Sequence, residues 1–219
     1  NGLGLVGNSG VNVEELYKLE KNKPKIYTNN YVHAPNIEKA VEIQGATFKY
    51  LNSDTPIFEN INIDIHKHSH TVITGPNGSG KSTLLGMIAG LYLPETGKTK
   101  TYSKHIGYVG VTPLVFEGSL KENLLYGNNK VVDDLKIYDL LEEFQFFNDE
   151  KFELTKLISN KTLSSGQLQK ISFIRSLLND SDILLLDEST SNLDEKSKKF
   201  IFSILNEKKL TIINSTHNY

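Results

Sequence analysis

The residues best suited to chemistry stand in one short stretch of the chain. Residues 75–82 are Gly-Pro-Asn-Gly-Ser-Gly-Lys-Ser, the G-x-x-x-x-G-K-S pattern of a phosphate-binding loop (P-loop). Gly78 and Gly80 let successive backbone N–H groups turn toward anionic oxygens. We expect Lys81 to reach the β- and γ-phosphates of a nucleotide and the Ser82 hydroxyl to hold Mg²⁺. The predicted nucleotide-binding residues here are Gly75, Pro76, Asn77, Gly78, Ser79, Gly80, Lys81, Ser82 and Thr83.

Such a loop works only between a strand and a helix. Residues 70–74 form a short β-rich run, and residues 83–89 form an apolar run typical of a helix. A helix that begins near Lys81 would point the positive end of its dipole at the same phosphates. A glycine-rich turn that matches by chance is the alternative, and the flanking elements argue against it.

Two carboxylates follow a second strand candidate. Residues 183–186 are Ile-Leu-Leu-Leu, as expected of a buried parallel strand, and Asp187 and Glu188 come directly after them. The carboxyl end of such a strand faces the crevice where α/β folds bind ligands. Asp187 fits the role of a Mg²⁺ partner opposite Ser82. Glu188 fits a general base or a group that orients water. The alternative is a strand followed by a plain acidic cap.

The composition sets the class of protein. The chain has 219 residues, a net charge of −2 and no cysteine. This length suits one large domain, or one domain with an appendage. Without cysteine there is no disulfide scaffold or thiolate metal site, and the charge gives no field that favours nucleic acid. Neither a signal peptide nor an apolar run of roughly 20 residues is present, so any membrane association is expected through a partner or further sequence.

The rest of the chain supplies the elements that position these residues. The apolar patterns predict an α/β fold: a P-loop NTPase core with an antiparallel β subdomain and a helical insertion. The expected strands are residues 41–48, 57–65, 70–74, 105–109, 183–186 and 211–214. The expected helices are residues 83–92, 164–178 and 196–205, and residues 119–159 are expected to be mainly helical.

Local patterns make these expectations more specific. Gly45 is a predicted β-bulge, and Ser119 with Glu122 resembles a helix capping box. One side of residues 57–65 should be apolar, through Ile61, Ile63 and Ile65. A helical stripe is expected from Leu135, Tyr138, Leu141 and Phe144. His66, His68 and His70 alternate as on one strand, where a solvent-facing row is favoured over a metal site.

Residues 163–167, Leu-Ser-Ser-Gly-Gln, stand at the start of the helix expected at 164–178. They resemble the LSGGQ signature motif of ABC-type ATPases. The motif offers a second phosphate cradle at a helix N-terminus, made of Ser164, Ser165, Gly166 and Gln167. Tyr50 stands where this family places an aromatic that stacks on adenine, Asp194 where it places the D-loop, and His217 where it places the switch histidine. Residues 116–123 are similar to the segment after the Q-loop in exporter-type members, and the resemblance covers residues 40–219.

The resemblance implies the nucleotide-binding domain of an exporter-type ABC transporter, with ATP and Mg²⁺ as cofactors and ABC ATPase architecture. It implies Lys81, Glu188 and His217 as catalytic residues, and Ser82 and Asp187 as metal ligands. The implied partners are a second nucleotide-binding domain, packed head to tail so that each signature motif completes the other's ATP site, and a transmembrane domain in the same polypeptide. No nucleic acid is implied. Such a domain works at the cytoplasmic face of a membrane, where closure on ATP and reopening on hydrolysis drive export.

The same resemblance suggests a division of the chain. Residues 1–35 are expected to form a juxtamembrane helix and linker, with a disordered leader as the alternative. Residues 36–219 are expected to form the nucleotide-binding domain, with a helical subdomain at about 112–178. The chain stops soon after His217, whereas family domains continue, which indicates truncation at the C-terminus.

One residue departs clearly from the family. The Q-loop glutamine corresponds to Val111, which has no amide to offer to Mg²⁺ or water. We therefore expect nucleotide binding to persist and hydrolysis to be slow or weakly coupled. Two alternatives stay open. Val111 favours a weakly catalytic or non-catalytic domain that acts as an ATP clamp in a heterodimer, and the other alternative is a soluble ABC ATPase outside transport.

Overall fold

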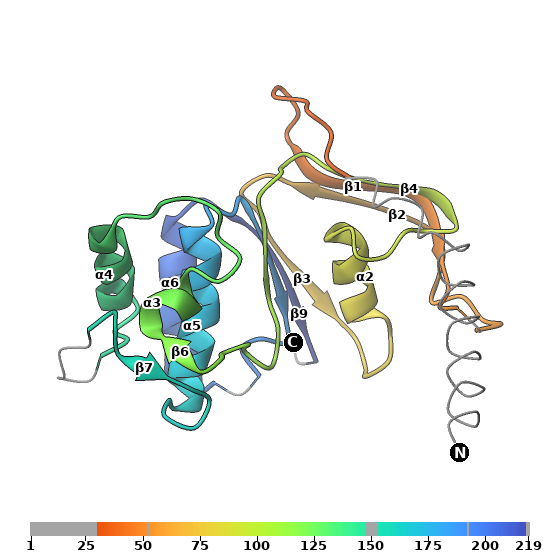
Figure 1. Ribbon diagram of the computed structural model, residues 1–219. Helices are drawn as coiled ribbons and strands as arrows, with labels where there is room; N and C mark the ends of the chain where they lie inside the picture. Colours follow the sequence, from red (N-terminus) through yellow and green to blue (C-terminus); the bar gives the residue numbers. More distant parts are fainter. Residues whose placement is uncertain (1–29, 52, 148–152, 192, 218–219) are drawn as a thin grey trace, which may run out of the picture.

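The computed structural model describes residues 30–51, 53–147, 153–191 and 193–217, and it is a layered α/β molecule (Figure 1). Its strands are β1 (Lys39–Phe48), β2 (Phe58–His66), β3 (His70–Thr74), β4 (Thr96–Thr101), β5 (Ile106–Val109), β6 (Gly118–Ser119), β7 (Leu157–Ile158), β8 (Ile183–Asp187) and β9 (Thr211–Thr216). Its helices are α2 (Lys81–Ile88), α3 (Leu120–Leu124), α4 (Asp134–Glu143), α5 (Ser165–Leu178) and α6 (Glu195–Glu207). The expected fold class is confirmed. The proposed juxtamembrane helix lies outside the described residues.

The first part of the chain forms an antiparallel sheet with the strand order β2-β1-β4. The predicted bulge is confirmed, because the β1–β2 register shifts between Ile43 and Ala46 and Gly45 has a φ of 57°. The alternation along β2 is also confirmed, since Ile61, Ile63 and Ile65 are more buried than the residues between them. Strand β4 has no counterpart in the sequence-based expectation. Its sequence, TGKTKT, has no apolar residue, and its ladder with β1 defines it as a strand.

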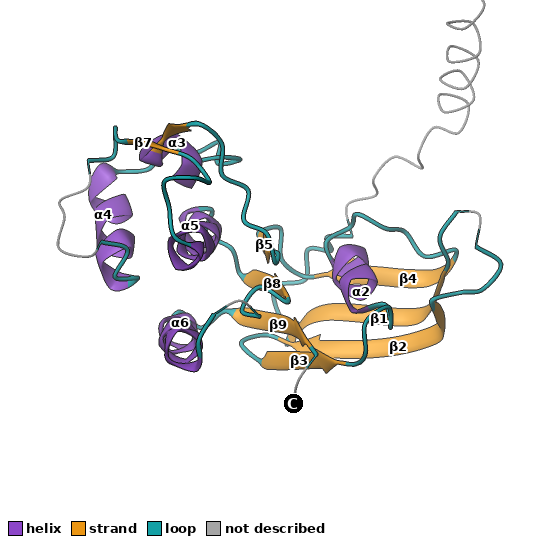
Figure 2. Ribbon diagram, turned by 90° about the horizontal axis from the view of Figure 1, so that it is seen from below, coloured by secondary structure: helices purple, strands orange, loops and turns teal. Residues whose placement is uncertain are grey.

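A four-stranded parallel sheet, in the order β3-β9-β8-β5, forms the centre of the molecule (Figure 2). The carboxyl ends of parallel strands lie at one edge of a sheet. Here that edge carries the end of β3 before the P-loop, Asp187 at the end of β8 and Thr216 at the end of β9. In register, Asp187 lies beside Ser215 of β9. The sheet therefore brings three distant stretches of sequence to one place.

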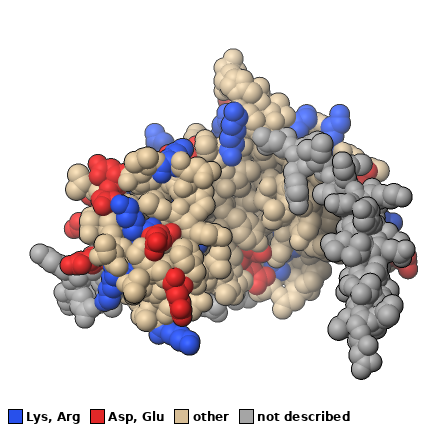
Figure 3. Space-filling model, viewed as in Figure 1, with Lys and Arg blue, Asp and Glu red and all other residues tan. Residues whose placement is uncertain are grey.

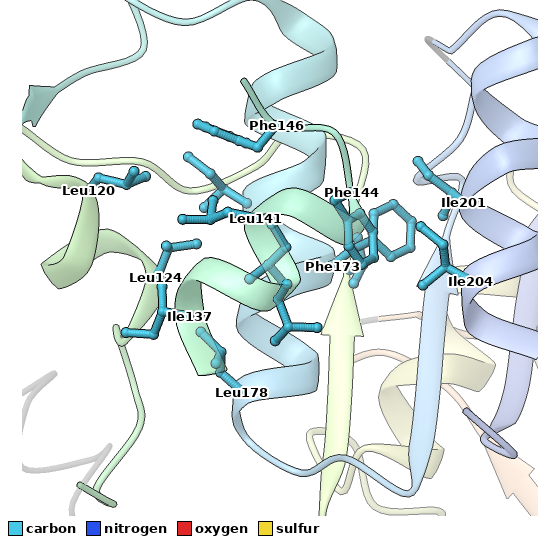
Figure 4. Packing of buried hydrophobic residues seen from close by; sticks show 14 of the residues in the cluster. Leu120, Leu124, Ile137, Leu141, Phe144, Phe146, Phe173, Leu178, Ile201 and Ile204 are labelled. Carbon is cyan, nitrogen blue, oxygen red and sulfur yellow. The ribbon is translucent and has the colours of Figure 1, made fainter. Parts of the chain in front are cut away.

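The two faces of this sheet support separate hydrophobic cores. Ile183 and Leu185 of β8 face one side and pack with α2 and the antiparallel sheet. Leu184 and Leu186 face the other side and pack with α5, α6, α3 and α4. Figure 4 shows part of this second core, where Phe144 after α4 stacks on Phe173 of α5 with 6.4 Å between ring centroids. Such fully buried apolar side chains each contribute about 1.5–3 kcal/mol.

The region 119–159 is less helical than expected. Its described residues form the short helix α3, the ten-residue helix α4, strand β7 and the last residue of strand β6. The capping box is confirmed, with Ser119 and Glu122 each accepting from the other's backbone N–H. The expected helical spacing is confirmed, because Leu135, Tyr138 and Leu141 lie on α4 and Phe144 is its C-cap. Leu135 is nevertheless 69% exposed, and the buried residues of α4 are Ile137, Leu140 and Leu141.

The expected histidine row is also wrong. His68 lies in the turn between β2 and β3 with a φ of 59°, and its ring contacts the carbonyl of Lys209. Only His66 and His70 belong to strands, and they belong to different ones. Elsewhere on the surface, basic and acidic side chains are interspersed on the face seen in Figure 3. Within the described ranges, no helix is long and apolar enough to cross a bilayer.

Candidate nucleotide-binding site

The P-loop adopts the geometry that its glycines permit. Gly78 and Gly80 have φ values of 78° and 92°, in the left-handed region that glycine tolerates. Gly80 is the N-cap of α2 and also lies close to β2: a Cβ there would stand 2.5 Å from a methyl group of Ile57. A side chain at this position would therefore be strained in two ways. The loop delivers Lys81 and Ser82 as the first residues of α2, where backbone N–H groups have no helical acceptor.

Lys81 is the buried cation of the site, with 5% of its side chain exposed. Its Nζ donates to the carbonyl oxygens of Gly75 and Pro76 at 2.9 and 3.1 Å. The same nitrogen lies 3.6 Å from Oε1 of Glu188 and 3.3 Å from Nδ1 of His217. A buried ammonium surrounded by such partners can exchange them for other oxygens, and phosphate oxygens are among the best acceptors for it.

Asp187 accepts three hydrogen bonds from three different elements. Ser82 and Ser215 donate their hydroxyls to Oδ1 at 2.9 and 2.8 Å, and Tyr108 donates to Oδ2 at 2.6 Å. Burial and the hydrogen bond to Asp187 raise the pKa of the Tyr108 phenol, so it remains a neutral donor at ordinary pH. The carboxylate is therefore held at both oxygens.

Glu188 has an unusual backbone. Its φ is 51°, in the left-handed region that non-glycine residues rarely adopt, and its N–H donates to the carbonyl and the hydroxyl of Ser215 at 3.2 and 3.1 Å. Strained backbone of this kind clusters at functional sites. The Glu188 carboxylate is thereby turned toward His217, whose Nε2 lies 2.6 Å from Oε2. Lys81, Glu188 and His217 therefore form one contiguous charged cluster.

Tyr50 contacts α2 at Thr83. Its hydroxyl hydrogen-bonds with that of Thr83 at 2.7 Å, and its ring meets Phe48 and Tyr92 edge to face. The rings of Phe48 and Tyr92 are tilted against each other. Tyr92 packs directly over Gly86, where a Cβ would stand 2.5 Å from the ring. Tyr50 is 40% exposed, so it retains surface on which a flat ligand can stack.

The signature residues do not join this cluster. Ser164 caps α5 in a capping box with Gln167, and α5 lies on the opposite face of the parallel sheet from α2 (Figure 2). At Gly166, the second residue of the helix, a Cβ would meet nothing within 4 Å. Asp194 caps α6 through Ser197, as expected of a capping residue. Within one chain, the P-loop and the signature motif are thus separate surfaces.

Two site residues were missed by the sequence reasoning, Ser215 and Tyr108. Neither belongs to a motif, and each matters only because β9 and β5 flank β8 in the sheet. For Ser215 the only local signal is that Ile212 and Ile213 are followed by a polar stretch, Asn214-Ser215-Thr216, directly before His217. For Tyr108 no comparable signal existed.

The donor set at the sheet edge fits a magnesium ion. Ser82 and Asp187 offer a hydroxyl and a carboxylate whose oxygens are 2.9 Å apart, and hard oxygen donors are the ligands that Mg²⁺ prefers. Such an ion takes its remaining ligands from substrate phosphates and water. The cavity of about 490 Å³ that is lined by Lys67, Ile183 and Thr211 lies at the amino ends of the strands, away from this site.

Taken together, the fold and the cluster define a nucleotide-binding protein of the P-loop class. The chain belongs to the ABC transporter family, because the family model described as "ABC transporter" matches residues 58–191. Within that family, the fold and the P-loop are those of the ATP-binding domain.

Individual relatives agree with this assignment. The chain is 32% identical over 186 residues to "ABC transporter BEA3" of Gibberella fujikuroi, an alignment that covers 77% of this chain and 14% of that protein. It is 31% identical over 211 residues to "ATP-dependent permease MDL1" of Candida albicans, covering 88% of this chain and 31% of that protein. The chain thus spans less than a third of either relative.

The fold also matches a solved structure described as "Structure of a bacterial Atm1-family ABC exporter with ATP bound". The TM-score is 0.76 at 20% sequence identity, and the match covers 97% of this chain and 40% of that one. At this identity the likeness concerns the fold.

Proposed function

We propose that the chain binds and hydrolyses Mg-ATP and that this cycle drives export of a substrate across a membrane. The observation that carries the proposal is the convergence of three distant stretches of sequence in two adjoining groups. Lys81, Glu188 and His217 lie within hydrogen-bonding or ion-pair distance of one another, and Ser82 donates to Asp187 beside them. In this proposal residues 36–219 are the nucleotide-binding domain, residues 112–178 are its helical subdomain, and residues 1–35 lead from a transmembrane domain in the same polypeptide. The domain works at the cytoplasmic face.

Each side chain has a role that its surroundings permit. Lys81 exchanges its present acceptors for β- and γ-phosphate oxygens and neutralises their charge. Ser82 and Asp187 hold the metal, which when bound neutralises charge on the phosphate oxygens. Glu188 orients and polarises the attacking water, and His217 contacts the γ-phosphate. Tyr50 stacks on the adenine.

The signature motif is proposed to act on a second copy of the domain, or on a related one. The first backbone N–H groups of α5, at Ser165 and Gly166, have no helical acceptor and suit an anion. Because α5 and α2 belong to opposite layers of one chain, these groups would serve the ATP held by a partner. Two domains packed head to tail would then bury both nucleotides, with Asp194 at the contact.

The test is light scattering on Glu188→Gln at high protein concentration, with and without Mg-ATP. Removal of the carboxylate should prevent hydrolysis and trap the closed state, so we expect a dimer only with Mg-ATP. Glu59→Gln, at an exposed position of β2, is the matched control and should remain mainly monomeric under turnover. If Glu188→Gln binds nucleotide and stays monomeric in both conditions, the head-to-tail sandwich is wrong for this chain alone.

A second candidate function is favoured by Val111. This side chain is 40% exposed, and it has no polar atom to offer to water or metal. The domain would then bind ATP as a structural clamp beside a more active partner. Single-turnover hydrolysis by the assembled dimer separates the two functions: the enzyme converts bound ATP to ADP within seconds to minutes, whereas the clamp retains it.

A further inference from the structure

We propose that Tyr108 is the positioning residue of the metal site, holding the Asp187 carboxylate in the orientation that binds the divalent cation. The inference rests on the proposed function, because it assumes that Ser82 and Asp187 hold the metal. The group that it adds to the site is the Tyr108 hydroxyl on β5, which lies outside the P-loop, the signature motif and the switch histidine.

The contact itself is short and charge-assisted. The Tyr108 hydroxyl donates to Oδ2 of Asp187 at 2.6 Å, while Ser82 and Ser215 share Oδ1. Hydrogen bonds from a hydroxyl to a carboxylate at this distance are among the strong ones. With donors on both oxygens, rotation of the carboxylate about its Cβ–Cγ bond would break at least one of them. Tyr108 alone restrains Oδ2 among the contacts that the described residues show.

The strand register explains why a tyrosine is needed. Tyr108 pairs with Leu185 and Val109 pairs with Leu186, so Asp187 stands two positions beyond the partner of Tyr108. Two residues of a strand span about 6.6 Å. A phenol ring with its hydroxyl reaches over such a distance, whereas a serine or threonine side chain at the same position does not.

Neighbouring residues fix β5 at the required place. At Gly107 a Cβ would stand 2.8 Å from the Ser181 hydroxyl and 2.9 Å from Cβ of Ser176, so glycine allows β5 to lie close against α5. Beyond the strand, Gln169 of α5 is 4% exposed and donates to the carbonyl of Gly110 at 3.2 Å. Contacts at the main chain of Gly107 and Gly110 therefore fix both ends of β5. With the strand fixed, the Tyr108 side chain reaches toward Asp187 at the end of β8.

The identity of residue 111 gives Tyr108 its importance. The segment after β5 carries Val111 at the position that resembles the family's glutamine, and valine supplies no hydrogen bond. From this side of the site, the phenol of Tyr108 is therefore the polar group that reaches Asp187. Because it donates to the carboxylate that binds the metal, its removal should weaken metal binding more than nucleotide binding.

The test compares Tyr108→Phe with Tyr138→Phe, which removes a hydroxyl from a 40%-exposed ring on α4. Both changes are made in the Glu188→Gln background, so that hydrolysis does not obscure binding. Affinity for a fluorescent ATP analogue is measured first in EDTA, and Mn²⁺ affinity of the ATP-bound protein is then measured by electron paramagnetic resonance.

We expect Tyr108→Phe to weaken Mn²⁺ binding by about 10- to 100-fold, as loss of a ligand's hydrogen-bond partner does elsewhere, with nucleotide affinity in EDTA within about twofold. Tyr138→Phe should leave both affinities unchanged. Equal Mn²⁺ affinity in the two variants would overturn the inference, and so would a parallel loss of both affinities in Tyr108→Phe, which would indicate a purely structural role. Absence of ATP binding by the parent protein would instead overturn the proposed function, on which the inference depends.

Discussion

Replacement of Ser215 by alanine should destabilise the fold far more than its small change in volume suggests. The side chain is 1% exposed on β9 and joins the two acidic residues of the site. Its hydroxyl donates to Oδ1 of Asp187 at 2.8 Å and accepts from the N–H of Glu188 at 3.1 Å. Alanine removes both hydrogen bonds, whereas the Asp187 carboxylate and the Glu188 N–H remain and each loses one partner.

The size of the effect follows from these two contacts. A hydrogen bond to a charged group contributes about 1.5–3 kcal/mol and one between neutral groups about 0.5–1.5 kcal/mol. The second loss falls at the low end, because the Glu188 N–H keeps the Ser215 carbonyl at 3.2 Å. We therefore expect Ser215→Ala to lower the free energy of unfolding by about 2–4 kcal/mol. For a chain of this size each kcal/mol lowers the melting temperature by about 2–4 °C.

The matched control is Ser189→Ala. Ser189 is 2% exposed and close to the same site, but its hydroxyl has no hydrogen-bond partner among the described residues. Because a buried unsatisfied hydroxyl costs about 1–3 kcal/mol, its removal should be neutral or stabilising. Urea and thermal unfolding of both variants, without nucleotide, measure the difference. If Ser215→Ala is no less stable than Ser189→Ala, the reasoning from hydrogen bonds is refuted.

Two further predictions concern the rate and the pH dependence. Val111→Gln should raise ATP turnover and its stimulation by substrate in the full assembly, and unchanged turnover would contradict the view that residue 111 limits hydrolysis. Hydrogen bonds from Lys39 and from a lysine on β4 lower the pKa of Glu42 from 4.5 to about 2. A lowered folded-state pKa stabilises the fold above pH 4.5, and this contribution disappears as the pH falls from 4.5 toward about 2. Glu42→Gln should therefore lose less stability than the parent protein over that range in urea unfolding; identical losses would show that the ion pairs do not matter.

The fold was largely predictable because its strongest signals are local. A continuous apolar run followed by two carboxylates indicated β8, and glycines at two left-handed positions indicated the P-loop. The limits of such local signals appear in two segments. Strand β4 consists of threonine, lysine and glycine, so its partner β1 and not its own composition determines its structure. Helix α4 has more apolar residues than its one buried face can hold. Leu135 is therefore left exposed, although it fits the helical period.

The candidate site was predictable residue by residue but not as a geometry. The sequence indicated Lys81, Asp187, Glu188 and His217 separately, through motifs and through their order along the chain. It did not indicate that Lys81 and Glu188 lie 3.6 Å apart, or that Glu188 takes a left-handed backbone. The contributions of Ser215 and Tyr108 depend on strand order, which joins residues too far apart in the chain for any periodicity to reveal.

Replacement of Val111 should affect turnover and not stability, because main-chain contacts attach the segment after β5 to the rest of the fold. Helix α5 holds this segment at two points: Gln169 donates to the carbonyl of Gly110 at 3.2 Å, and Arg175 donates to that of Leu114 at 3.0 Å. Both acceptors belong to the main chain, so they are present whichever side chain stands at position 111. Valine there offers no polar group to the proposed metal site, and it leaves the attachment of the segment to α5 unchanged. A change at Val111 should therefore leave the unfolding midpoint nearly unchanged while it alters the rate of the chemical step.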